Sequence, residues 1–270
     1  MSFVVTDEIR VLVSGAGGRM GAETVRAISA EPDMDVVAAI DPALAGGTVA
    51  DAGGDPIAVS GDLGAAIAAT RPHVMVDFTR PDVVEGNIRT ALALGVDCVI
   101  GTTGLSPELL ESLAAEAPAG TCLFVAPNFA VGAVLMMRFA ETAARFMPSA
   151  EVIELHHDRK LDAPSGTAMR TARLIAAARS EAPVAPGRET ELPGAEGARG
   201  ALIEGVPVHS VRLPGLVAHQ EVVFGGPGQT LTIRHDSIDR TSFMPGVVLA
   251  VRSVAGMSGL IVGLESLMGL

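Results

Sequence analysis

The stretch "IRVLVSGAGGRMGAETVRAISA", residues 9–30, decides the fold expected for this chain. It opens with a short run rich in β-branched residues (9–15), passes through a glycine-rich turn (15–21) and continues with helical spacing (20–30). A strand that enters a helix through such a turn is the first unit of a dinucleotide-binding βαβ fold. The stretch therefore predicts a Rossmann-type start to the chain.

The glycine spacing supports a binding role for this turn. Glycine stands at positions 15, 17, 18 and 21, while Met20 breaks a strict G-x-G-x-x-G pattern and leaves the related G-x-x-G-x-x-G. Glycines permit the tight turn, the close approach of a pyrophosphate and the packing of helix on strand. The helix N-terminus adds unpaired N–H groups and the positive end of its dipole. The alternative is a glycine turn that binds nothing.

Asp41 strengthens the dinucleotide interpretation. It ends the next apolar run, "DVVAAID" (35–41), twenty residues after Gly21. An acidic residue at this spacing is placed to bind the ribose hydroxyls of a dinucleotide.

The rest of the first half alternates strands and helices. Strands are expected at 73–79 and 121–127, a strand followed by a turn at 97–104, and helices at 81–95 and 106–117. The helices begin with Pro in the first turn, and Ser106 is a natural N-cap. This alternation predicts an α/β fold with a doubly wound parallel sheet.

After residue 129 the pattern changes. Helices are expected at 130–147 and 165–180, a strand at 150–157, and an exposed loop at 181–200 because that stretch is rich in Pro, Gly, Glu and Arg. Three further runs with short Gly- or Pro-bearing connections indicate an antiparallel sheet; they are 206–214, 218–226 and 229–237.

Two domains follow from these patterns. Residues 242–257 are apolar enough to form a helix that returns to the first domain. We therefore expect a dinucleotide-binding domain of residues 1–129 and 242–270. Residues 130–241 are expected to form a second α+β domain with an antiparallel or mixed sheet, for substrate binding and oligomerisation.

Composition narrows the function further. The chain has 270 residues, is 49% apolar and carries a formal net charge of −12. An acidic chain is a poor partner for nucleic acid or an anionic membrane. The uncharged run 117–137 is interrupted by two prolines and an Asn, so we expect a strand, a turn and a helix start there rather than a membrane span.

No signal peptide is visible in "MSFVVTDEIR", and a cytoplasmic location is expected. Cys98 and Cys122 lie in apolar runs and are expected to be buried structural thiols.

Two more turns follow predicted parallel strands. "GTTG" (101–104) and "APNF" (126–129) each stand where ligands bind in open α/β sheets, beyond the carboxyl ends of strands. They are candidates for holding the nicotinamide end of a coenzyme. Ordinary turn chemistry is the alternative for each.

The stretch "HHDRKLDAPSGT" (156–167) contains the only lysine of the chain, Lys160. A metal site is disfavoured, because a cation would stand beside the imidazole ligands. A solvated polar loop is a second interpretation. The third is a pocket that binds an anion and donates a proton: Ser165 can cap a helix whose first amides form a carboxylate cradle. Lys can also release a proton, which Arg does not do in proteins.

The motifs "GAGGRMG", "DFT", "GTTG", "APNF" and above all "ELHHDRKLDAPSGTA" (154–168) resemble the dihydrodipicolinate reductase family. The resemblance runs over nearly the whole chain. It implies a nicotinamide-binding domain that includes the C-terminal helix, a substrate domain, and a homotetramer joined through the sheets of the substrate domains. In some members a basic residue directly follows the acid of the second strand, whereas this chain has Pro42.

By position, the resemblance implies that His156 is the catalytic acid/base and Lys160 the proton donor. The implied substrate contacts are His157, Ser165, Gly166, Thr167 and Thr103. The implied coenzyme contacts are Gly15, Ala16, Gly17, Gly18, Arg19, Met20, Asp41, Phe78, Gly101, Thr102, Thr103, Ala126, Pro127, Asn128 and Phe129. No metal is implied.

The reaction implied is reduction of the cyclic imine dicarboxylate 4-hydroxy-2,3,4,5-tetrahydrodipicolinate by NADH or NADPH, with loss of water, in lysine and diaminopimelate biosynthesis. We expect NADH to be favoured, because Asp41 would repel a 2′-phosphate and residues 42–47 contain no base; Arg19 is the nearest cation in sequence. Two alternatives stay open. One is another two-domain nicotinamide-dependent dehydrogenase, which would not need "DAPSGTA". The other is a non-enzymatic NAD(P) sensor, against which the intact His156, His157 and Lys160 argue.

Overall fold

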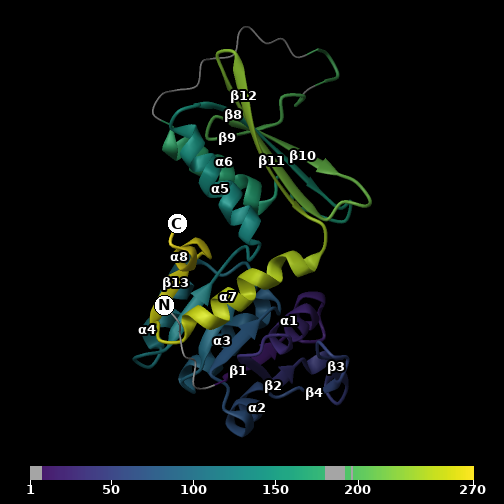
Figure 1. Cartoon of the computed structure of the whole chain (residues 1–270), viewed down its shortest axis with the longest axis vertical. Coiled ribbons are helices and arrows are strands. Elements are labelled where there is room, and N and C mark those ends of the chain that lie inside the picture. Colours follow the sequence, from purple (N-terminus) through teal and green to yellow (C-terminus); the bar gives the residue numbers. More distant parts are fainter. Residues whose placement is uncertain (1–7, 180–191, 196) are drawn as a thin grey trace. The chain divides into compact units, whose positions relative to one another are not determined.

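The computed structural model describes residues 8–179, 192–195 and 197–270. The chain divides into two compact units, residues 1–129 with 243–270 (unit 1) and residues 130–242 (unit 2) (Figure 1). The expected loop at 181–200 lies partly outside the described residues.

One largely parallel sheet forms the centre of unit 1. Its described strands follow the order β13-β7-β6-β5-β1-β2-β4-β3, and only the β3–β4 pair is antiparallel. The strands are β1 (Ile9–Ser14), β2 (Met34–Ile40), β3 (Thr48–Ala50), β4 (Pro56–Ser60), β5 (Val74–Asp77), β6 (Asp97–Ile100), β7 (Cys122–Val125) and β13 (Gly259–Val262). The chain turns from β1 to β2 on one side and later to β5 on the other. The switch point of the sheet therefore lies between β1 and β5.

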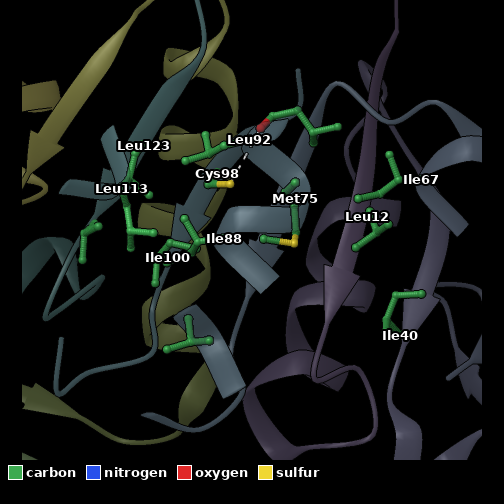
Figure 2. Close-up of a cluster of buried hydrophobic side chains, with 14 of the residues drawn as sticks. Leu12, Ile40, Ile67, Met75, Ile88, Leu92, Cys98, Ile100, Leu113 and Leu123 are labelled. Atoms are coloured by element: carbon green, nitrogen blue, oxygen red, sulfur yellow. Dashed lines mark hydrogen bonds between the residues drawn. The ribbon is translucent and has the colours of Figure 1, made fainter. Parts of the chain in front are cut away.

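Helices cover both faces of this sheet. Helices α2 (Leu63–Thr70), α3 (Pro81–Ala93) and α4 (Pro107–Glu116) supply side chains to one buried cluster with β1, β5, β6 and β7, which Figure 2 shows. Helices α1 (Arg19–Ser29) and α7 (Met244–Val254) contact each other and the same sheet but contribute nothing to that cluster, so they cover the opposite face. The predicted doubly wound fold is confirmed. A short helix, α8 (Glu265–Met268), follows β13.

Unit 2 is a mixed sheet with two helices on one face. The described strands follow the order β12-β11-β8-β10-β9. They are β8 (Ser149–His156), β9 (Ala201–Ile203), β10 (Val206–Arg212), β11 (Ala218–Gly226) and β12 (Gln229–Ser237). Helices α5 (Val131–Ala144) and α6 (Gly166–Ala178) pack small side chains such as Ala140 and Ala172 against Val152, Val222 and Phe224.

The expected pairing in this sheet needs one correction. Strands β11 and β12 form the predicted antiparallel hairpin, but β10 and β11 are not neighbours. Strand β8 lies between them and pairs in parallel with β10. Val152 of β8 is the register partner of both Val208 of β10 and Val222 of β11, and all three are buried in the cluster under the helices. The sheet is therefore mixed.

Both cysteines are buried and free, as predicted. Burial raises the pKa of Cys98, and burial raises the pKa of Cys122 to about 11. Protonated, enclosed thiols of this kind act as small apolar side chains.

Candidate functional site

A cavity of about 490 Å³ opens in unit 1 at the carboxyl ends of its parallel strands. Its walls come from the turns after β1, β2, β4 and β5, the edge where ligands bind in open α/β sheets. The volume lies in the range of small-molecule sites. Gly15, Gly18, Asp41 and Phe78 line the cavity as expected; so do Ser14, Ile40, Pro42, Ala43, Gly61, Leu63, Thr79, Arg80, Val83 and Asn87.

The glycine loop fits a pyrophosphate because side chains would close it. Gly15 has φ of +79°, where L-residues are strained. A Cβ on Gly17 would lie 2.7 Å from Asp41 Oδ2, and a Cβ on Gly21 would overlap the carbonyl of Gly15. Gly18 caps α1 without a side-chain bond, which leaves the first amides of the helix free to face an anion.

Asp41 is fixed by the backbone on both oxygens. The Gly17 amide donates to Oδ2 and the Ala43 amide donates to Oδ1, each at 3.0 Å. Each carboxylate oxygen keeps a further lone pair for a ribose hydroxyl. The acid and the glycine loop, twenty-odd residues apart in sequence, thus form one rigid surface of the cavity.

Behind the cavity a fully buried carboxylate, Asp77, joins three strand ends. The Thr79 amide and hydroxyl and the Thr102 hydroxyl donate to its Oδ1 at 2.9, 2.7 and 2.8 Å. The Asn87 side-chain amide donates to Oδ2 at 2.8 Å and to Ser14 Oγ at 3.2 Å. Asp77 therefore fixes the turns that carry Phe78 and "GTTG". The motif "DFT" did not indicate these roles of Asp77 and Asn87.

Aromatic packing holds the remaining turns of this region together. The Phe78 ring lies where a Cβ on Gly101 would be, and Phe129 meets Phe78 edge to face at 5.7 Å between centroids. The other predicted coenzyme residues flank these groups with differing exposure. Ala16, Thr102 and Ala126 are buried, Met20 and Asn128 are partly exposed, and Arg19, Thr103 and Pro127 are exposed.

In unit 2, the stretch that carries the lysine surrounds a second buried carboxylate, Glu154. His156 Nδ1 lies 2.5 Å from Glu154 Oε2, and Arg212 binds both oxygens at 2.9 and 2.8 Å. The Ser165 amide donates to Oε1 at 3.2 Å. Burial alone would raise the pKa of Glu154, but hydrogen bonds from His156, Arg212 and Ser210 outweigh it and lower the pKa to about 2. The group is ionised at neutral pH.

Lys160 lies on the loop between β8 and α6. Its Nζ donates to both carboxylate oxygens of Asp162 at 2.8 Å, and 22% of its side chain is exposed. Arg212 donates to the Asp162 carbonyl at 2.7 Å, so the lysine loop is tied to the Glu154 cluster.

The expected carboxylate cradle is the N-terminus of α6. Ser165 is its N-cap, and the side chain accepts from the Ala168 amide at 3.2 Å. Nothing lies within 4 Å of a Cβ placed on Gly166, so the helix start is open there. His157 Nδ1 is buried and has no hydrogen-bond partner among the described residues.

Within the described ranges, His, Cys, Asp and Glu form no group of three or more that could hold a metal ion. In the same ranges no helix has both the length and the apolar character needed to cross a membrane.

Several functional candidates were missed from sequence. Glu154 and His156 share one face of β8 because side chains repeat every second residue, and Glu154 occupies an inward position. The sequence signal that could have identified Glu154 was a carboxylate at an inward-facing position of a predicted strand. No sequence signal marks Arg80, Asn87 or Arg212. The fold brings them to the sites from segments that are far apart in the sequence.

A glycine loop, an acidic residue fixed against it and a cavity at the carboxyl edge of a doubly wound sheet define a dinucleotide-binding protein of the Rossmann type. Family models for "Dihydrodipicolinate reductase, N-terminus" and "Dihydrodipicolinate reductase, C-terminus" match residues 9–129 and 132–268. The chain therefore belongs to the dihydrodipicolinate reductase family, as its motifs predicted.

Individual relatives agree over nearly the full length. The 4-hydroxy-tetrahydrodipicolinate reductase of Mycobacterium sp. (strain KMS) is 50% identical over 97% of this chain and 100% of its own length. That of Syntrophomonas wolfei is 49% identical over 96% of this chain and 98% of its own. A dipicolinate-bound dihydrodipicolinate reductase from Paenisporosarcina sp. TG-14 has a TM-score of 0.83 and 42% identity, covering 96% of this chain and 99% of that one. Membership makes this chain a reductase of lysine and diaminopimelate biosynthesis.

Proposed function

We propose that the chain reduces 4-hydroxy-2,3,4,5-tetrahydrodipicolinate with NADH or NADPH, and that unit 1 binds the coenzyme while unit 2 binds the imine. Overall, the imine, the reduced coenzyme and one proton give tetrahydrodipicolinate, the oxidised coenzyme and water. The bound coenzyme supplies the hydride. The observation that carries the proposal is the cluster in which Glu154 joins His156, Ser165 and, through Arg212, the Lys160 loop.

The roles follow from the chemistry of each group. Lys160 is the proton donor, and the N-terminus of α6 offers backbone amides for a substrate carboxylate. His156 and His157 supply imidazole nitrogens, of which His156 is the catalytic acid/base and His157 a substrate contact. Thr103 is proposed as a further substrate contact from unit 1. A cytoplasmic location is part of the same proposal.

The direct test is consumption of NADH that depends on the imine. We further expect pyridine-2,6-dicarboxylate (dipicolinate), a flat dicarboxylate, to inhibit competitively with the imine. The same compound is bound in the structure of the Paenisporosarcina relative. Changing Ser165 and Thr167 together to Ala should weaken this inhibition at least about 10-fold, because the helix cap and its amides are disturbed. Inhibition that the double change leaves intact would place the dicarboxylate elsewhere.

Coenzyme preference is expected to favour NADH several-fold in kcat/KM. Asp41 is proposed to bind the ribose hydroxyls, and the charge of a 2′-phosphate near it would cost about 1 kcal/mol at 4 Å in water-like surroundings. Sequence proximity pointed to Arg19 as the compensating cation, but Arg80 lines the cavity and Arg19 does not. Asp41→Ser should narrow the gap. Arg80→Ala should lower kcat/KM with NADPH more than Arg19→Ala does. A wild-type preference for NADPH would contradict the role given to Asp41.

The uncovered face of the unit 2 sheet is proposed as the surface that forms a homotetramer. Both described helices of this unit lie on the other face. On the strands of this sheet Val208 and Val222 are buried under those helices, whereas Val223 lines a hollow of about 650 Å³ on the other face with Ile153, Pro207 and Leu202. Light scattering should give a tetramer, and Val223→Asp should shift it to smaller species. A stable wild-type monomer at assay concentrations would refute the proposal.

A further inference from the structure

Glu154 is a carboxylate in an apolar environment. It is fully buried on β8, on the face whose neighbours Ala150 and Val152 pack against α5 and α6. Burying a charge is costly unless it is paired and hydrogen-bonded. A chain that needed only packing at this strand position would use an apolar residue there.

The partners of Glu154 come from three segments of unit 2. His156 ends the same strand, Ser165 begins α6, and Arg212 ends β10. Arg212 also donates to the carbonyl of Asp162, whose side chain holds Lys160. One carboxylate therefore fixes the imidazole, the helix start and the lysine loop relative to one another.

The pairing also determines which nitrogen of His156 carries a hydrogen. An ionised carboxylate held in a two-bond fork by Arg212 can only accept hydrogen bonds. At 2.5 Å from Glu154 Oε2, Nδ1 must then be the N–H of the ring. Nε2 is left as the nitrogen that gains and loses a proton, as in catalytic groups in which a buried carboxylate orients an imidazole.

We propose that Glu154, held in place by Arg212, is a positioning residue that fixes His156 as the Nδ1–H tautomer and directs Nε2 to the substrate. The proposal rests on the proposed role of His156 as the acid. It adds a specific consequence, because a glutamine at position 154 would reverse the arrangement. The Gln oxygen would take the Oε1 position, where Arg212 and the Ser165 amide donate. Its NH₂ group would take the Oε2 position, where it loses the bond from Arg212 Nη1, faces His156 Nδ1 and donates to it, which makes Nε2 the N–H.

The test begins with the wild-type protein. ¹⁵N NMR of protein labelled at its histidines, at a pH where the rings are neutral, should show His156 as the Nδ1–H tautomer. The signal is assigned by its loss in His156→Gln. An Nε2–H tautomer in the wild type would overturn the proposal without any further variant.

Glu154→Gln should convert His156 to the Nε2–H tautomer and lower kcat at least about 10-fold, the usual scale for a group that orients an active one. KM should change less than kcat. The matched control is Glu141→Gln, which removes a carboxylate from an Arg138 pair on α5 in the same unit; neither the tautomer nor kcat should change. If Glu154→Gln does not fold, Glu154→Gln with Arg212→Met removes both charges together, and the same readouts apply.

The outcomes separate this inference from the function on which it rests. A folded Glu154→Gln enzyme with the wild-type tautomer, or with kcat within about 3-fold of wild type, would refute the positioning role. Full activity in His156→Gln would instead remove His156 from the chemistry, whatever its tautomer.

Discussion

Replacing Lys160 by either Arg or Met is expected to lower turnover by at least about 100-fold, the lower range for positioned acid–base groups. Arg keeps the charge but does not release a proton in proteins, while Met keeps the length and loses both properties. The side chain is tied to Asp162, on the loop that Arg212 anchors, so the ammonium is held in place rather than freely mobile. Steady-state kinetics with the imine and NADH measure the effect.

Arg159→Met is the control for this experiment. Arg159 is the exposed neighbour of Lys160, and its loss removes one positive charge from the same loop. Its kcat should stay within about 2-fold of wild type, as is usual for an exposed surface change. A nearly fully active Lys160→Arg enzyme would show that charge alone suffices at this position. Lys160 and the N-terminus are the only alkyl amines of the chain, so amine labelling should inactivate the enzyme, and bound dicarboxylate should protect it.

Gly21→Ala is expected to destabilise unit 1 by about 3 kcal/mol or more and to abolish measurable coenzyme binding. A Cβ at this position would overlap the carbonyl of Gly15 and the Cα of Ala16, which are backbone atoms that cannot rotate away. Overpacking of this kind costs about 1–3 kcal/mol even where side chains can yield. The glycine loop must shift to admit the methyl group. Thermal unfolding and NADH titration by fluorescence measure the two effects.

Gly86→Ala supplies a matched control on another helix of the same unit. Gly86 lies within α3, and a Cβ there has nothing within 4 Å. Alanine in a helix interior is favoured over glycine by about 0.5–1 kcal/mol. This variant should therefore unfold at a slightly higher temperature than the wild type and bind NADH normally. A Gly21→Ala protein that behaves like Gly86→Ala would show that α1 does not approach the loop as closely as the structure has it.

The parts of the fold that could be predicted from sequence are those with local signals. The glycine turn, the Pro81 and Ser106 helix starts and the β11–β12 hairpin each depend on a few consecutive residues. Strands β3, β4 and β13 were not predicted, because they are short and surrounded by Gly, Pro and Asp. Their strand conformation depends on a neighbour in the sheet rather than on their own composition.

The strand pairing predicted for β10 and β11 was wrong for a related reason. The hairpin rule assumes that strands close in sequence pair, but β8, which comes much earlier in the chain, pairs with both β10 and β11. Long-range preference of this kind leaves no mark in the turn between β10 and β11. The same holds for Arg212, which reaches Glu154 only because β8 and β10 are neighbours.

The candidate site was predicted as a set of residues but not as an arrangement. His156, Lys160 and Ser165 were chosen from one stretch, yet their common link is the carboxylate of Glu154, whose identity as a buried acid needs the strand alternation to be recognised. In unit 1, Asp77 has the corresponding place behind Phe78 and Thr102. In both units the residues expected to touch ligands are supported by an ionic or polar residue one layer deeper.

Unit 1 is built from two separated segments of the chain, and this has a consequence for its synthesis on the ribosome. Strand β13 pairs with β7, α7 contacts α1, and a Cβ on Gly246 of α7 would overlap the Phe129 carbonyl at the end of the first segment. Residues 243–262 are synthesised only after all of unit 2. Until they emerge, the sheet of unit 1 lacks strand β13, and helix α7 does not yet cover its second face. Until then the α7-facing apolar surface is open to water and to other chains, a state prone to aggregation. Unit 2, which is continuous, can complete its own core first.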